Sequence, residues 1–260
     1  MTFETLKLEW EDAVGILTFN RPEKRNAIST VMIGELLDAL AEIERSPGRV
    51  AILTGAGSVF SAGMDLEDLR RLASQSIQQN LADSRRVATL FHRIFSFPKP
   101  LIAAVNGAAI AGGCGLATLC DFTLAVPGAK FGYSETRIGF IPALVSVFLV
   151  RQIGEKRARD LLLTGRLVDA AEAQALGLVN EVVPEEKLPA RARALANTLL
   201  GNSPGSLTRT KMLLSDFSRR ELDFHIDLAI DANARIRATE DFREGVTAFL
   251  EKRPPKWTGR

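Results

Sequence analysis

The amino-acid sequence predicts a mixed α/β fold followed by a helical C-terminal region. Apolar runs at residues 14–19, 50–54 and 101–105 have the composition of short buried strands, and helical patterns lie between them. The chain has 260 residues, of which 46% are hydrophobic and 25% are charged. A chain of this size and composition can bury one large core and carry a smaller appendage.

The first half of the chain alternates strands and helices in a β-β-α order. The strand at residues 14–19 is followed by Ser29 and Thr30, either of which can cap a helix. The apolar positions of that helix recur at helical spacing: Ile33, Leu36, Leu37, Leu40 and Ile43. A later helix at residues 85–95 stops before Pro98.

Helical patterns dominate after Pro142. Asp169 stands three residues before Glu172, which is typical of a capping box, and Gly177 is a suitable stop for that helix. Ser203 is followed directly by proline, a combination typical of an N-cap and the first helical residue.

We therefore divide the chain into a core at residues 1–200 and a helical region at residues 201–260. Apolar residues at helical spacing mark one face in this region, among them Leu222, Ile226 and Ile230. Such a face packs on its own domain or on a second copy of the chain, and packing on its own domain is the more common case.

The most informative segment is a glycine-rich turn between a predicted strand and a predicted helix. Gly107, Gly112, Gly113 and Gly115 follow the buried strand at residues 101–105. Glycine is favoured where φ is positive or where another group approaches the backbone closely. The free N–H groups of a helix that starts here would favour negative charge. The alternative interpretation is a turn whose glycines serve tight packing only.

A second turn of small residues leaves the strand at residues 50–54 and continues through residues 55–66. Two such turns can aim two backbone N–H groups at one carbonyl oxygen. This arrangement, an oxyanion hole, stabilises developing negative charge and requires no cofactor.

A set of further short motifs occurs in order along nearly the whole chain: Asn20–Ala27, Phe60–Leu66, Ala104–Gly107, Ala111–Cys114, Phe131–Glu135, Ile138–Gly139, Leu163–Gly165 and Ala175–Val179. A single motif of this kind is weakly specific, whereas the ordered set is highly specific. On this set the chain resembles the enoyl-CoA hydratase/isomerase family, also called the crotonase superfamily, and within it the bacterial enoyl-CoA hydratase-like branches.

The resemblance implies a crotonase-like spiral of ββα units, followed by a helical region that mediates trimer formation. It also implies an acyl-CoA thioester as substrate and a homotrimer or a dimer of trimers as the assembly. No cofactor is expected, because coenzyme A is part of the substrate.

The resemblance also assigns catalytic roles. The backbone N–H groups of Met64 and Gly112 are the expected donors to an enolate oxygen, and the Met64 side chain can also form an apolar wall. Glu135 is the expected proton-transfer group, in an otherwise apolar setting that raises a carboxyl pKa. The structural alternative for Glu135 is an ion pair with Arg137, since strand-like alternation would place both on one face.

Coenzyme A is expected at two loops and at the C-terminus of the chain. Lysine is a flexible point charge suited to phosphate, so Lys252 can reach a phosphate across a subunit boundary. The alternative for Lys252 is a solvated terminal lysine. The full set of expected substrate-binding residues is Lys24, Arg25, Ala62, Gly63, Met64, Asp65, Leu66, Gly112, Gly113, Gly115 and Lys252.

One position departs from the family pattern. Where two-glutamate hydratases of the family carry their first catalytic glutamate, this sequence has Gly115. Our leading hypothesis is an enoyl-CoA hydratase that works with Glu135 alone. The alternatives are an enoyl-CoA isomerase that uses Glu135 as sole proton shuttle, and a non-catalytic relative that binds coenzyme A or RNA.

Charge and composition argue against several other classes of protein. Lys and Arg total 33 against 31 Asp and Glu, so we expect no nucleic-acid or membrane partner. His92 and His225 lack metal-ligand spacing, so no metal is expected. Cys114 and Cys120 do not share a helix face, which argues against a disulfide. No signal peptide or long apolar run is visible, and we expect a cytoplasmic protein.

Overall fold

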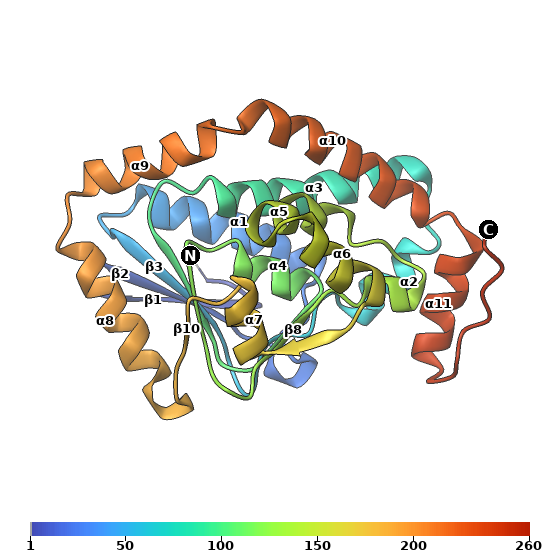
Figure 1. Cartoon of the computed structure of the whole chain (residues 1–260), viewed down its shortest axis with the longest axis horizontal. Coiled ribbons are helices and arrows are strands. Elements are labelled where there is room, and N and C mark those ends of the chain that lie inside the picture. Colours follow the sequence, from blue (N-terminus) through green and yellow to red (C-terminus); the bar gives the residue numbers. More distant parts are fainter. Residues whose placement is uncertain (1) are drawn as a thin grey trace.

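Within residues 2–260, which the computed structural model describes, the strands form two sheets (Figure 1). The larger sheet has the order β1 (Leu6–Glu11), β2 (Val14–Phe19), β3 (Val50–Gly55), β5 (Leu101–Val105), β7 (Phe122–Ala125) and β10 (Glu181–Val182). The smaller sheet has the order β4 (Val59–Ser61), β6 (Ala108–Ile110), β8 (Lys130–Gly132) and β9 (Leu167–Asp169).

Successive turns of the chain each add one strand to the larger sheet and then one strand to the smaller sheet. β3, β5 and β7 pair in parallel in the larger sheet, and each is followed by β4, β6 or β8, which pair in parallel in the smaller one. A helix or helical turn then follows each strand pair. These repeats confirm the expected spiral of ββα units. β4, β6 and β8 were not predicted separately, because strands of three residues have too short an alternating pattern to identify.

Helices cover the sheets, and α10 crosses over α3 and α5 (Figure 1). The α-helices are α1 (Thr30–Arg45), α2 (Leu66–Leu72), α3 (Ile77–Phe95), α4 (Gly112–Thr118), α5 (Ala143–Ile153), α6 (Glu155–Thr164), α7 (Ala170–Leu176), α8 (Leu188–Leu200), α9 (Pro204–Asp216), α10 (Arg219–Ile236) and α11 (Glu240–Leu250). The 3-10 helices are η1 (Pro22–Lys24), η2 (Glu135–Ile138) and η3 (Glu185–Lys187). None of the helices in residues 2–260 is long and apolar enough to cross a membrane.

The predicted helix caps are confirmed. The Ser29 side chain accepts a hydrogen bond from the Met32 N–H at the start of α1. Asp169 caps α7, and Ser203 caps α9. The helix predicted at residues 85–95 begins earlier, at Ile77, because a capping box of Ser76 and Gln79 starts it.

The helices after residue 200 share the main hydrophobic core with the strands. Leu222 and Ile230 of α10 are buried in that core, and Ile226 packs against it half-buried. This face of α10 therefore packs on its own chain, which was the more common of the two cases considered.

Helix α11 packs against η2 with the two backbones in direct contact. A Cβ atom placed on Gly245 of α11 would overlap the backbone carbonyl of Ile138. In the same way, a Cβ on Gly139 would overlap the carbonyl of Asp241. The position of η2 therefore depends on the absence of a side chain at Gly245.

We predict opposite effects for the same substitution in two helices. Gly34→Ala in α1 meets no atom within 4 Å and should stabilise the fold by about 0.5–1 kcal/mol, because alanine favours the helix. Gly245→Ala should destabilise it by about 1–3 kcal/mol through overpacking. Thermal unfolding of both variants measures this, and stabilisation by Gly245→Ala would contradict the close packing of α11.

Candidate active site

Two turns meet at one edge of the smaller sheet. Met64 follows β4 and Gly112 follows β6, and the carboxyl ends of these parallel neighbours lie at the same edge. The residue before each donor has a positive φ, +91° at Gly63 and +52° at Ala111. A Cβ placed on Gly63 would lie 3.2 Å from the Cβ of Ala111, so the turns touch. Alanine seldom adopts this conformation, and such strain is concentrated at functional sites.

The two predicted backbone donors have no partner among the residues that the structure describes. The Ile28 N–H donates to the carbonyl of Gly63 at 2.7 Å, and the Asp65 N–H donates to the carbonyl of Ile28 at 3.0 Å. The N–H of Met64, between these bonds, finds no acceptor within residues 2–260. The same holds for the N–H of Gly112, the first residue of α4. Two polar N–H groups are thus available to a bound molecule.

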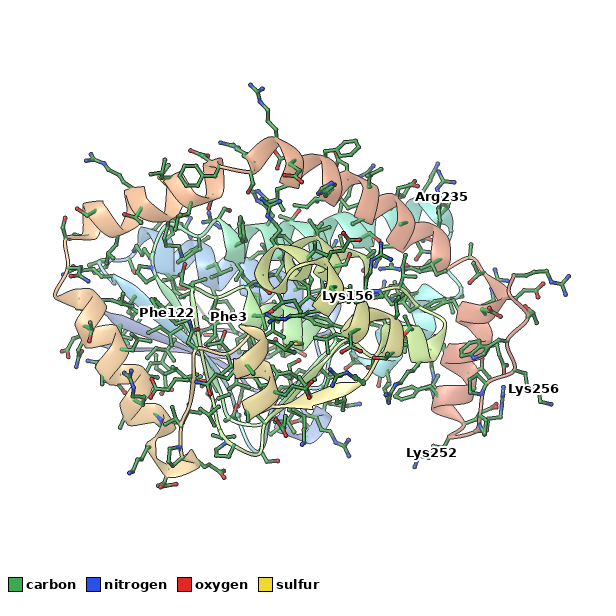
Figure 2. All side chains as sticks on the ribbon, in the orientation of Figure 1. Phe3, Phe122, Lys156, Arg235, Lys252 and Lys256 are labelled. Atoms are coloured by element: carbon green, nitrogen blue, oxygen red, sulfur yellow. The ribbon has the colours of Figure 1, made fainter. Side chains whose placement is uncertain are left out.

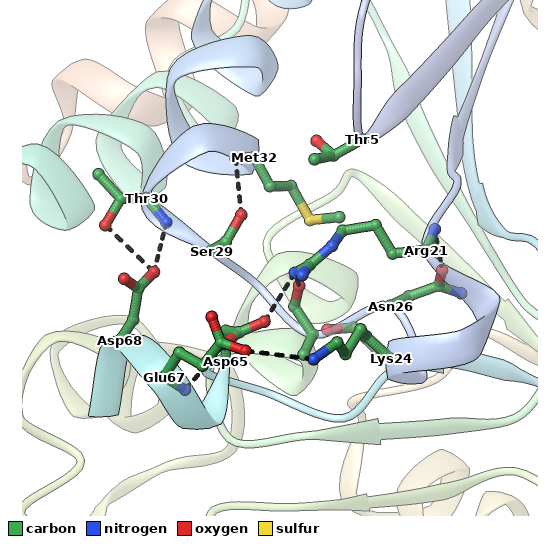
Figure 3. Close-up of polar contacts among 12 residues, drawn as sticks. Thr5, Arg21, Lys24, Asn26, Ser29, Thr30, Met32, Asp65, Glu67 and Asp68 are labelled. Atoms are coloured by element: carbon green, nitrogen blue, oxygen red, sulfur yellow. Dashed lines mark hydrogen bonds and ion pairs between the residues drawn. The ribbon is translucent and has the colours of Figure 1, made fainter. Parts of the chain in front are cut away.

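Polar contacts hold the first turn in place, as Figure 3 shows. The Arg21 guanidinium donates to the carbonyl of Ala27 at 2.8 Å and pairs with the Asp65 carboxylate at 2.9 Å. Asp65 also accepts a hydrogen bond from the N–H of Glu67 and so caps α2. Burial by itself would raise the pKa of Asp65, but the Glu67 N–H and the Arg21 guanidinium bring it below its ordinary value. Asp65 is therefore a fixed, ionised capping group.

Glu135 lies at the same edge of the sheet. It starts η2 just after β8, which pairs in parallel with β6, and the N–H of Ala111 donates to the carbonyl of Gly132 in β8 at 2.7 Å. The Glu135 side chain is buried, and its Oε2 atom has no hydrogen-bond partner within residues 2–260. Burial raises the pKa of Glu135 to about 7.

The alternative interpretation of Glu135, an ion pair with Arg137, is wrong. Residues 135–138 form a 3-10 helix, so Arg137 does not share a face with Glu135 as it would in a strand. Arg137 instead lies beside Gly165, where a Cβ would be 3.2 Å from the Arg137 Cγ. No cation pairs with Glu135 among the residues that the structure describes.

A cavity of about 700 Å³ joins these groups. Most of the predicted site residues line it: Lys24, Arg25, Ala62, Met64, Asp65, Leu66, Gly112, Glu135 and Lys252. Gly63, Gly113 and Gly115 do not line it, because neighbouring groups cover them. Lys252, at the end of α11 (Figure 2), lines the cavity of its own chain, so it reaches this site without a subunit boundary.

The cavity is mainly apolar, and sequence reasoning missed its walls. Helix α3 contributes Val87, Leu90 and Phe91, and α5 contributes Leu144 and Val145. Helix α10 and the residue after it add the polar side chains of Asn233 and Arg237. Helical spacing could mark the apolar residues as buried, but it could not tell a cavity wall from a solid core.

The space beside Gly115 is filled by apolar side chains. A Cβ placed on Gly115 would lie 2.8 Å from the Val145 Cγ1 and 3.3 Å from the Phe91 Cζ. Of the other carboxylates that line the cavity, Glu23 is exposed and Asp65 is paired. Glu135 is therefore the one buried, unpaired carboxylate in the cavity lining within residues 2–260.

Comparison with known proteins identifies the family of this chain. Residues 9–260 match the enoyl-CoA hydratase/isomerase family. The chain belongs to that family.

Individual relatives match over nearly the whole chain. A protein of Thermus thermophilus, provisionally named an enoyl-CoA hydratase, is 49% identical over 94% of this chain and 97% of its own. The crotonyl-CoA hydratase of Syntrophomonas wolfei is 35% identical over 97% of both chains. The crystal structure of an enoyl-CoA hydratase/isomerase from Xanthobacter autotrophicus superimposes with a TM-score of 0.89, at 30% identity, covering 96% of this chain and 97% of that one.

The burial of Glu135 predicts a pH-dependent gain in stability for Glu135→Gln. The native pKa is raised from 4.5 to about 7, so folding disfavours the ionised form, and wild-type stability falls as pH rises between these values. The glutamine side chain carries no charge, so the variant should be more stable than wild type at pH 8, by on the order of 3 kcal/mol. The difference should vanish near pH 4.

Chemical denaturation across this pH range measures the difference. Glu23→Gln is the matched control, because Glu23 lines the same cavity but is exposed, and its effect should be small at every pH. A Glu135→Gln variant that lost stability equally at all pH values would overturn the assignment of a buried, unpaired carboxylate.

A carboxylate at position 115 should not fit. Gly115→Glu should destabilise the fold by at least about 2 kcal/mol, because its Cβ overlaps Val145. Val145→Ala alone should cost about 1–2 kcal/mol through the cavity that it leaves. The double variant should lose about 1 kcal/mol less unfolding free energy than the two single variants lose together. Thermal unfolding of all three variants measures this difference as a coupling energy. Strict additivity would show that Val145 does not fill this space.

Proposed function

We propose that this enzyme is an enoyl-CoA hydratase, which adds water across the 2,3-double bond of an enoyl-CoA thioester. One observation carries the proposal: within residues 2–260, the buried Glu135 carboxyl group, whose Oε2 atom has no hydrogen-bond partner, and two unpartnered N–H groups belong to the lining of one mainly apolar cavity. The relative named as a crotonyl-CoA hydratase supports the same reaction.

In this mechanism the N–H groups of Met64 and Gly112 bind the thioester oxygen. Negative charge collects on that oxygen as water adds to C3, and an enolate forms. Each backbone donor of this kind typically contributes about 100- to 1000-fold to the rate. Because the backbone holds both donors in place before the reaction, little reorganisation is required.

Glu135 handles the proton in both steps. The ionised carboxylate accepts a proton from water while the water oxygen bonds to C3 and the double-bond electrons move toward the thioester oxygen. The carboxyl group then returns that proton to C2 of the enolate, which restores the carboxylate. A pKa of about 7 suits a group that must both accept and donate.

Basic residues at the cavity are proposed to hold coenzyme A, which enters as part of the substrate and not as a cofactor. Lys24, Arg25 and Lys252 line the cavity, and their charges complement phosphate groups. The Lys24 ammonium lies 3.4 Å from the Glu67 carboxylate, an exposed pair that phosphate can replace at little expense.

Isomerisation of an enoyl-CoA is the second candidate reaction. The apolar packing of Val145 and Phe91 against Gly115 favours it, because no second carboxylate is present there to hold water. Glu135 would then remove a proton from C2 and deliver it to C4, and the double bond would move into conjugation with the thioester.

The assembly is proposed to be a homotrimer or a dimer of trimers, located in the cytoplasm. Large apolar side chains on α9, α10 and the two-residue segment between them are more than half exposed, which supports a subunit interface: Met212, Leu213, Leu214, Phe217, Phe224 and Leu228. Cys114 and Cys120 are free thiols, in keeping with a reducing compartment.

Turnover of crotonyl-CoA tests the proposed function. Hydration should remove the absorbance of the conjugated thioester, whereas isomerisation of a 3-enoyl-CoA should increase it. Glu135→Gln should lower kcat at least about 100-fold and leave thioester binding nearly unchanged. The wild-type rate should rise with pH through a single ionisation near the Glu135 pKa of about 7, since the base must be ionised.

Three results would contradict these roles. Near wild-type turnover by Glu135→Gln would remove Glu135 from the mechanism. Two interacting ionisations on the acidic limb would require a second catalytic carboxylate. Binding of thioesters or RNA without any turnover would identify a non-catalytic relative.

A further inference from the structure

A cluster of buried polar residues lies at one wall of the mainly apolar cavity. Asn80 and Ser84 come from α3, and Asn233 and Arg237 come from the end of α10 and the residue that follows it. Each of the four is at most 5% exposed. Asn233 and Arg237 line the same cavity as Glu135. A polar wall is unexpected in a cavity that would hold only a hydrocarbon chain.

The amide of Asn233 has a fixed orientation. Its oxygen accepts hydrogen bonds from the Ser84 hydroxyl and the Arg237 guanidinium, both at 2.7 Å. Arginine has no acceptor atom, so the group that faces Arg237 must be the amide oxygen. The Asn233 NH₂ group therefore points elsewhere, and it has no acceptor within residues 2–260.

The charge of Arg237 is already compensated. Its guanidinium pairs with the Asp83 carboxylate at 2.8 Å, donates to the Asn80 side chain at 3.3 Å and lies over the Phe140 ring. These contacts hold the Arg237 side chain in place. The cluster therefore offers the cavity a hydrogen-bond donor, the Asn233 amide, without a net charge.

We infer that the acyl chain of the substrate carries an oxygen atom beyond the reacting double bond, and that this oxygen accepts a hydrogen bond from Asn233. The inference rests on the proposed function, which places an enoyl thioester in this cavity. Helix α10 packs on α3 and α5, the helices that form the apolar walls beside Gly115, so Asn233 lies on the acyl side of the cavity. Since the cluster is neutral, a keto oxygen suits it.

The expected selectivity follows from the unpaired donor. A hydrocarbon chain would bury the Asn233 NH₂ group without a partner, whereas a keto group would satisfy it. The oxygenated substrate should therefore be preferred by about tenfold or more in kcat/KM.

Matched pairs of 2-enoyl-CoA thioesters of increasing length test the inference. One member of each pair ends in a hydrocarbon, and the other carries a keto oxygen near its end. A third series of thioesters of the same lengths carries a terminal carboxylate. Preference for either oxygenated chain at some length supports the inference, and a keto chain preferred over the carboxylate supports the neutral cluster. Equal kcat/KM for the keto and hydrocarbon chains at every length, with no gain from the carboxylate, would overturn it.

Asn233→Asp is the decisive variant. It keeps the shape of the side chain and the oxygen that faces Ser84 and Arg237, but it replaces the NH₂ donor with an acceptor. The ratio of kcat/KM for the keto chain to that for the matched hydrocarbon chain should fall at least about tenfold. Asn197→Asp, the same change on an exposed position of α8, is the control and should leave the preference unchanged. A preference that survives in Asn233→Asp would exclude this residue.

Failure of the inference is distinguishable from failure of the proposed function. Hydration of crotonyl-CoA without discrimination between keto and hydrocarbon chains would contradict only the role of Asn233. If no thioester is turned over, the proposed function fails. Titration calorimetry with the saturated keto and hydrocarbon acyl-CoA thioesters then still tests Asn233, since the same tenfold difference should appear in Kd.

Discussion

The site depends on the parallel pairing of β4, β6 and β8 in the smaller sheet. Parallel strands end at one edge, and these three are followed there by Met64, Gly112 and Glu135. Each strand is only three residues long, so the larger sheet and its helices must hold the smaller sheet in register. The positive φ values at Gly63 and Ala111 then turn the chain so that the N–H groups of Met64 and Gly112 find no acceptor in the described part of the chain.

The same packing that creates the site also destabilises the fold locally. Glu135 is buried and forms no ion pair within residues 2–260, and this burial raises its pKa to about 7. The close backbone contact between α11 and η2 holds Glu135 in its buried position despite this unfavourable burial. The burial that the proposed proton-transfer role of this carboxyl group requires therefore lowers the stability of the fold at neutral pH.

The polarity of the cavity is unevenly distributed. Beside Gly115, where a second carboxylate is absent, Val145 and Phe91 form an apolar contact. On the α10 side, Asn233 presents an unpaired donor supported by Arg237. The first feature limits how water can be held, and the second determines which acyl chains can be buried without loss of hydrogen bonds.

The sequence by itself determined the helix caps and the family of this protein. Helix caps such as Ser29 and Asp169 depend on neighbouring residues only, and the ordered motifs identified the family and marked Glu135 and the two turns as candidate site residues. Tertiary structure decided the rest, because it depends on residues far apart in the chain. It separated Arg137 from Glu135, brought Lys252 to its own cavity, covered Gly115 with Val145 and placed the Asn233 amide in the cavity wall. Helical spacing predicts that such residues are buried, whereas only packing determines what they face.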